Sequence, residues 1–112
     1  AMKTKRKEDY RHRFQRLMTN LQFYEKALDW FAEQTDENLL LAAERVLLDL
    51  NYSAYPPSWG KTITGTRCRE ILFAKDYRLY FHLQGSTKTI LVIGHKNEQK
   101  QHIEWLKQQR VA

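Results

Sequence analysis

The sequence contains few of the residues that cross-link or interrupt small folds. Its 112 residues include one cysteine, two prolines and four glycines. The single cysteine, Cys68, excludes an internal disulfide and a cysteine-based zinc cluster. No apolar run approaches the ~20 residues that a membrane-spanning helix needs, so we expect a cytoplasmic protein without membrane contact. A glycine-rich phosphate loop, an H-E-x-x-H helix and a G-x-S-x-G turn are also missing. We therefore expect no cofactor and no bound metal.

Positive charge is in excess and unevenly distributed. The 19 lysines and arginines exceed the 13 acidic residues, giving a net charge of +6, which favours an anionic partner such as nucleic acid. Residues 3–16 carry seven basic and two acidic side chains, residues 17–59 two and seven, and residues 60–112 ten and four. The sequence therefore predicts a basic segment at residues 1–13, either a phosphate-binding arm or the frayed start of a helix.

The first half of the chain has the apolar spacing of helices. Apolar residues recur at three- and four-residue steps from Phe14 to Phe31 and again from Leu39 to Leu50, which places each series on one helical face. Thr35 and Asp36 are suited to cap the second helix. Residues 55–58 contain two adjacent prolines, and these should end the helical region. We expect a helical hairpin.

The second half is typical of short strands. Segments rich in β-branched and aromatic residues are separated by turn signals at Lys75-Asp76 and at residues 84–87. These segments cover residues 68–74, 77–83 and 89–94, with a weaker one at 61–64. Asn97 is placed to cap a closing helix. The order predicts a single α+β domain over residues 1–112, with an N-terminal helical hairpin packed on a three- to four-stranded antiparallel sheet and a short C-terminal helix.

Three consecutive motifs within residues 60–108 resemble the RelE/ParE superfamily, the toxins of bacterial type II toxin–antitoxin systems, in a RelE/HigB-like form. The motifs are Gly65-Thr66-Arg67-Cys68-Arg69-Glu70-Ile71-Leu72-Phe73, Asp76-Tyr77-Arg78-Leu79-Tyr80-Phe81 and Ile90-Leu91-Val92-Ile93-Gly94-His95-Lys96-Asn97. The resemblance implies two helices against a curved antiparallel sheet. It also implies an acidic antitoxin protein that covers the basic face.

The ribonuclease branch of this superfamily cuts messenger RNA at the ribosome without a metal. The reaction needs a base for the 2′-hydroxyl, cations for the phosphorane and an acid for the leaving oxygen. Histidine suits the acid–base roles because its ordinary pKa is ~6.5. The resemblance gives the catalytic candidates His102, Lys96, His95 and Arg67. It gives the RNA-binding candidates Arg69, Arg78, Lys61, Lys100 and Tyr80.

Other interpretations of the same residues stay open. Phe73 occupies the position where the family often has an arginine, and this favours a non-catalytic ParE-like toxin that inhibits DNA gyrase. A small basic nucleic-acid- or protein-binding module without toxicity is the third alternative. Arg78 either contacts phosphate or pairs with an acid such as Glu70. The RNA-binding hypothesis requires Arg67, Arg78, Lys96 and His102 to lie on one side of the molecule.

Overall fold

The computed structural model of the protein describes residues 1–53 and 60–110, and the predicted break at residues 55–58 lies outside that range. The described part contains four α-helices, five strands and a short 3₁₀ turn, η2. The elements are α1 (Met2–Leu17), β1 (Leu21–Phe23), α2 (Glu25–Glu33), α3 (Glu37–Tyr52), β2 (Lys61–Thr62), β3 (Cys68–Phe73), β4 (Tyr77–Gln84), β5 (Thr87–His95), η2 (Lys96–Glu98) and α4 (Gln99–Lys107). The predicted α+β class is confirmed.

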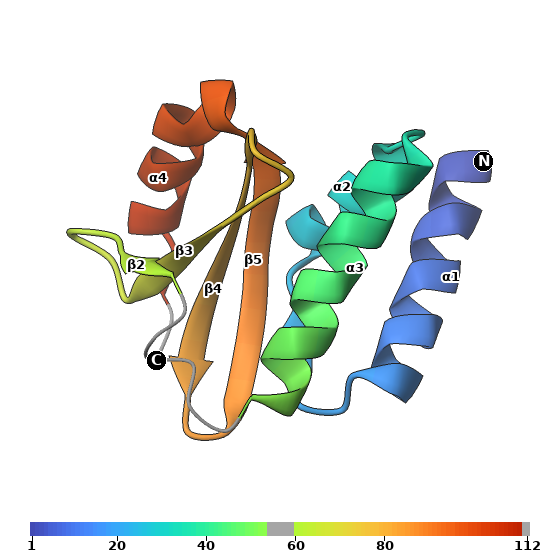
Figure 1. The fold of residues 1–112 in the computed structure, drawn as a ribbon, viewed down its shortest axis with the longest axis horizontal. Coiled ribbons are helices and arrows are strands. Elements are labelled where there is room, and N and C mark those ends of the chain that lie inside the picture. The colour runs from blue at the N-terminus through green and yellow to red at the C-terminus, as the bar shows by residue number, and fades with distance from the viewer. Residues whose placement is uncertain (54–59, 111–112) are drawn as a thin grey trace.

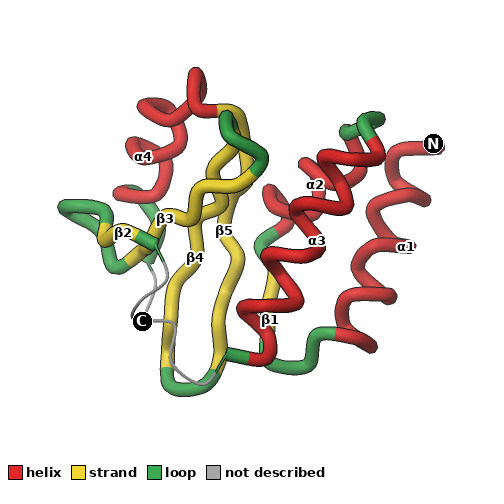
Figure 2. The backbone as a smooth tube through the Cα atoms, in the orientation of Figure 1, coloured by secondary structure: helices red, strands yellow, loops and turns green. Residues whose placement is uncertain are grey.

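The strands form one mixed sheet rather than the purely antiparallel sheet that the sequence predicts. Their order is β1-β5-β4-β3-β2, with β1 parallel to β5 and every other pair antiparallel. The short β1 lies beside the first part of β5 (Figure 2). A strand of three residues is too short to show the alternation by which strands are recognised. The strand predicted at residues 61–64 is also present, but it covers only Lys61–Thr62.

The single helix predicted from Phe14 to Phe31 is divided by β1. Asn20 explains the interruption, because its backbone N–H donates to the Asn51 side-chain oxygen and its side-chain amide donates to the Asn51 carbonyl, both at 2.9 Å. The Asn20 carbonyl also accepts from the N–H of Lys88. These tertiary hydrogen bonds replace the helical ones, while Phe14 and Phe31 still pack in one core.

The sheet separates two apolar layers. Helices α1, α2 and α3 lie on one side of it, and α4 lies on the other side (Figure 1). The larger layer joins the three N-terminal helices to the sheet. The smaller layer, under α4, consists of Ile63, Cys68, Tyr80, Leu91, Val92 and Leu106. A register shift between Tyr80 and Phe81 explains why the consecutive residues Leu91 and Val92 both belong to the α4 side.

The turns and helix caps predicted from the sequence are present only in part. The β3–β4 turn forms at the predicted place without glycine, since Ala74 and Lys75 take positive φ angles of 47° and 67°. Asp36 caps α3 as expected, accepting from the N–H groups of Asn38 and Leu39. The predicted cap by Asn97 is wrong, because the His95 side chain and Glu98 form the capping box of η2 instead.

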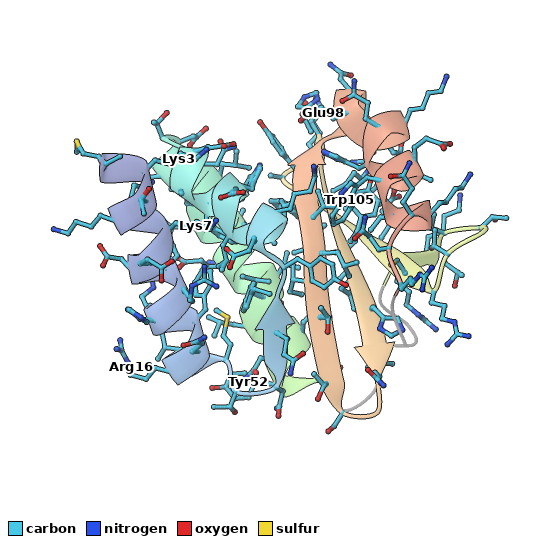
Figure 3. All side chains as sticks on the ribbon, turned by 180° about the vertical axis from the view of Figure 1, so that it is seen from behind. Lys3, Lys7, Arg16, Tyr52, Glu98 and Trp105 are labelled. Atoms are coloured by element: carbon cyan, nitrogen blue, oxygen red, sulfur yellow. The ribbon has the colours of Figure 1, made fainter. Side chains whose placement is uncertain are left out.

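The basic N-terminal segment forms most of α1 and pairs with acidic residues of the helices beside it. Lys3 pairs with Glu33, and Lys7 lies 2.8 Å from both Glu25 and Asp29. Figure 3 shows Lys3 and Lys7 on the side of α1 that faces α2. Further along the helix, cations pair in the same way: Arg11 with Glu25 and Arg13 with Glu44. The acidic middle of the chain therefore neutralises much of the basic start. Across residues 1–53 and 60–110, no helix is both long and apolar enough to cross a bilayer.

Candidate functional site

Four ionisable side chains gather on the sheet face that α4 covers. Glu70 lies on β3, Arg78 and Tyr80 on β4, and His102 on α4. Glu70 is directly opposite Tyr80 in the antiparallel pair, and Arg78 is opposite Gly94 of β5. Even-numbered residues of β3 and β4 point to this face because side chains alternate along a strand. We call these four residues the α4-face cluster.

Glu70 is held from two directions. The Gln99 side-chain amide at the start of α4 donates to Glu70 Oε2 at 2.6 Å, and Arg78 Nε lies 3.9 Å from Glu70 Oε1. Arg78 also donates from Nη1 to the carbonyl of Tyr77 at 3.1 Å. Glu70 is the acid that the sequence suggested as a partner of Arg78. Glu70 itself is only 5% exposed, so its charge acts in a poorly hydrated environment.

His102 packs directly against Gly94. A Cβ built on Gly94 would lie 2.2 Å from His102 Cε1, closer than any two carbon atoms can approach without displacement. The His102 ring also contacts the Tyr80 ring, with centroids 6.1 Å apart in a T-shaped arrangement. The missing side chain at position 94 therefore makes the space into which the imidazole fits.

Three buried polar atoms of this cluster have no hydrogen-bond partner. Within the described part of the chain, these atoms are Arg78 Nε, Tyr80 Oη and His102 Nδ1. Buried polar side-chain atoms in folded proteins are usually hydrogen-bonded, and leaving one unpaired costs roughly 1–3 kcal/mol. All three atoms belong to side chains of the α4-face cluster.

Burial determines the protonation of the cluster. It lowers the pKa of His102, and nearby Lys26 lowers it further while Glu98 opposes both. It raises the pKa of Tyr80, and the negative charge of Glu70 adds to that rise. Near neutral pH, His102 is therefore unprotonated and able to accept a proton, whereas Tyr80 keeps its hydroxyl proton.

A cavity of about 430 Å³ reaches His102. It lies beside the second part of β5, beyond the three residues that pair with β1. Helix α2 contributes Lys26, Asp29, Trp30, Glu33 and Gln34 to its lining, and the sheet with α4 contributes Tyr77, Val92, Ile93, His95, Glu98 and His102. Of the three carboxylates in this lining, Asp29 pairs with Lys7 and Glu33 pairs with Lys3.

The remaining predicted residues lie outside the cluster. His95 contacts the Tyr77 ring at 5.2 Å and accepts from the N–H of Asn97. Lys96 pairs with Asp76 at 3.2 Å, and this contact lowers the pKa of the Asp76 carboxyl group. Arg67 is exposed in the loop between β2 and β3, and Lys61 and Lys100 are exposed on β2 and α4.

Arg69 and Tyr80, both predicted to bind RNA, point to opposite faces of the sheet. Arg69 shares the alternation of Ile71 and Phe73, which belong to the core under α1 to α3, so it points away from Arg78. Tyr80 is 0% exposed and can meet RNA only after α4 moves. The structure thus brings together His102, Arg78 and Tyr80 and places His95 with His102 in the lining of one cavity, whereas Arg67 and Lys96 do not line that cavity.

Glu70, Gln99 and Gly94 complete the site, although none was predicted as a site residue. Glu70 had one recognisable signal, a carboxylate that shares the alternation of the small apolar residue Cys68 in a predicted strand. Gln99 and Gly94 had none, because their roles depend on where α4 crosses the sheet.

Comparison with protein-family models, with curated proteins and with solved structures gives no match for this chain. Among the described residues, no group of three or more His, Cys, Asp or Glu side chains is arranged to hold a metal ion.

Proposed function

We propose that this chain is a RelE-type toxin that cleaves messenger RNA and that the α4-face cluster carries out the cleavage. The supporting observation is the gathering of a histidine, an arginine and a tyrosine at one place on the sheet, each with a buried polar atom that lacks a hydrogen-bond partner. Cleavage of RNA by its own 2′-hydroxyl requires a proton acceptor, a cation and a proton donor within reach of one phosphate. These three side chains are of the types that can supply them.

In the proposed reaction, neutral His102 takes the proton of the 2′-hydroxyl. The 2′-oxygen forms a bond to the adjacent phosphorus while the bond from phosphorus to the 5′-oxygen breaks. Arg78 stabilises the negative charge of the phosphorane, and Tyr80 gives its proton to the leaving 5′-oxygen. The products are a 2′,3′-cyclic phosphate and a 5′-hydroxyl. Glu70 acts as a positioning residue, because it holds Arg78 in place.

RNA reaches this cluster only if the start of α4 lifts from the sheet while its end stays in place. Glu70, Tyr80 and His102 are all buried, and α4 covers them with nine residues. The Gln99–Glu70 hydrogen bond ties the start of the helix to the sheet, and Leu106 anchors its end in the smaller apolar layer. Short helices with few buried apolar residues are the elements that open at low free-energy cost.

The decisive experiment adds the purified protein to a translating extract and maps messenger RNA ends by primer extension. The wild-type protein should cut, and His102→Gln and Arg78→Lys should each lower the rate by about 100-fold or more. His82→Gln is the matched control, since His82 is also buried, on β4, but outside the cluster. Thermal unfolding should verify that each variant is folded. Intact messenger RNA with the wild-type protein would refute the proposal.

A ParE-like inhibitor of DNA gyrase is the second candidate. The observation in its favour is Phe73, which replaces the family's arginine and is 7% exposed in the core, with its ring 6.1 Å from that of Trp30. If this candidate is right, expression should leave incorporation of labelled amino acids intact at first, while purified protein should block supercoiling by gyrase. A neutral growth curve on strong expression would favour a non-toxic binding module over both toxins.

A further inference from the structure

The uncompensated positive charge of the molecule lies in its C-terminal half. Residues 3–16 sum to +5 and residues 17–59 to −5, so the net charge of +6 belongs to residues 60–112. The ion pairs between α1 and α2 show this cancellation in the fold. Within residues 60–110, carboxylates engage Arg78, Lys96 and Lys107. An anionic partner is therefore attracted to the cations of this half that have no carboxylate beside them.

Three cations of this half line a groove where the β2–β3 loop meets the end of α4. The groove has a volume of about 610 Å³, and its charged lining residues are Arg67, Lys107 and Arg110. Its other lining residues are Gly65, Thr66, Leu106 and Gln109, so it contains no carboxylate. Within the described part of the chain, neither Arg67 nor Arg110 has an ion pair, and Lys107 lies 3.6 Å from the exposed Glu104.

The loop that carries Arg67 is fixed by its own hydrogen bonds. The Thr66 hydroxyl donates to the carbonyl of Ile63 at 2.9 Å and accepts from the N–H of Cys68 at 3.0 Å. Gly65 takes a φ of 81°, and a Cβ there would lie 3.4 Å from Cε of Lys107, in ordinary contact. The loop therefore holds Arg67 across from the end of α4 before any ligand arrives, which limits the entropy lost on binding.

We propose that this groove binds the phosphate groups of single-stranded RNA beside the segment that is cut. The inference rests on the proposed function, because it takes the anion to be the substrate's own backbone. The cluster lies under the first half of α4 and the groove at its end. The nine residues of α4 span ~13 Å, a separation that a few nucleotides of an extended strand can bridge. Such contacts carry no sequence preference, only affinity and orientation.

Lys107 and Arg110 have a competing explanation, because cations near a helix C-terminus also offset the negative end of the helix dipole. That explanation does not account for Arg67, which belongs to a loop rather than to α4. It predicts a loss of thermal stability on removal of the cations, whereas phosphate binding predicts a change in the salt dependence of RNA affinity.

The test measures binding of a fluorescent 2′-O-methyl RNA oligonucleotide, which cannot be cleaved through its 2′-position, between about 50 and 200 mM salt. The double variant Arg67→Gln/Arg110→Gln should bind about tenfold more weakly at the low-salt end. Its plot of log affinity against log salt should be shallower by about 1.4, the value for two lost phosphate contacts on a single strand. The control Lys5→Gln/Arg16→Gln removes the same charge from the exposed side of α1 and should leave the slope unchanged.

Each outcome separates the groove from the proposed function. An unchanged slope in the double variant overturns the groove even if the wild-type protein cuts messenger RNA. A reduced slope in a protein that cuts no messenger RNA supports the groove and refutes the proposed function. Tighter, groove-dependent binding of duplex DNA would overturn the assignment to RNA. A loss of thermal stability in Arg67→Gln/Arg110→Gln without any change in slope would establish the helix-dipole explanation instead.

Discussion

Gly94 is required by a close approach rather than by an unusual backbone angle. The His102 imidazole occupies the position of the absent side chain, so any larger residue must push α4 away from the sheet. Gly94→Ala should therefore lower the free energy of unfolding by about 1–3 kcal/mol, the usual cost of overpacking a core. It should also expose Tyr80, whose burial depends on α4.

Urea unfolding and tyrosine accessibility would measure both effects. The control is Gly85→Asn, because a Cβ at Gly85 meets nothing within 4 Å and its φ of 61° suits asparagine. If Gly94→Ala proves as stable as Gly85→Asn, α4 does not pack as the structure shows.

The two buried histidines make stability depend on pH. Burial lowers the pKa of His102 and of His82, with Arg67 adding to the effect at His82. The unfolded chain binds protons near the ordinary pKa of ~6.5, whereas the folded chain resists protonation until lower pH. The unfolded state therefore binds more protons in that window, and the free energy of unfolding should fall as pH drops below about 6.5, by at most ~1.4 kcal/mol per pH unit for each histidine.

Denaturant unfolding at a series of pH values checks this. His102→Gln should flatten the curve below about pH 6.5, and His12→Gln, at an exposed position of α1, should leave the slope as in the wild-type protein. A steeper fall for His102→Gln would mean that His102 is protonated in the folded state.

At the scale of elements, the sequence predicts strands better than it predicts their partners. The three segments rich in β-branched residues match β3, β4 and β5 within one or two residues, because a strand's composition is local information. The parallel pairing of β1 depends on Asn20 bonding to Asn51, 31 positions away, and no local pattern contains it. The same reason applies to the site. The sequence identifies Arg78 and His102 as residues with suitable chemistry, but the position of α4 over Gly94 depends on tertiary contacts that no local pattern contains.

Helix α1 is attached through the buried Phe14 and through ion pairs to α2, and the ion pairs make part of its docking sensitive to salt. Phe14 is its only buried residue, while Arg11 and Lys7 lower the pKa of Glu25 to about 2. Exposed ion pairs are individually weak and are screened by salt. Glu25→Gln removes the carboxylate that both cations share, and it should raise the amide exchange rates of α1 roughly two- to fivefold.

Hydrogen exchange measured by mass spectrometry would resolve this change by segment. Amides of β4 and β5 should exchange as before, since both strands lie in the interior of the sheet. Lys5→Gln, at an exposed position on the same helix, is the control and should have no effect. If raising the salt concentration slows exchange in α1, apolar contacts rather than charge hold it in place.

The whole molecule has a charge-balanced side and a basic side. Helices α1 to α3 carry acids and bases that neutralise each other, and the excess cations follow the sheet and α4. Lys100→Glu on α4 and Lys5→Glu on α1 change the net charge equally, from +6 to +4. Both lysines are exposed, so neither change removes a buried contact. Long-range attraction that depended on net charge alone would weaken RNA binding to the same extent in both variants.

If RNA instead settles against α4, the local contact dominates, because screening limits an exposed charge to about 10 Å at 0.1 M salt. Lys100→Glu should then weaken binding of single-stranded RNA several-fold more than Lys5→Glu at the same ionic strength, as measured by fluorescence anisotropy. If both variants lose the same RNA affinity, the RNA does not bind preferentially at α4. A larger loss for Lys5→Glu would move the interface to α1, where the ion pairs with α2 would have to open before the helix could bind a phosphate.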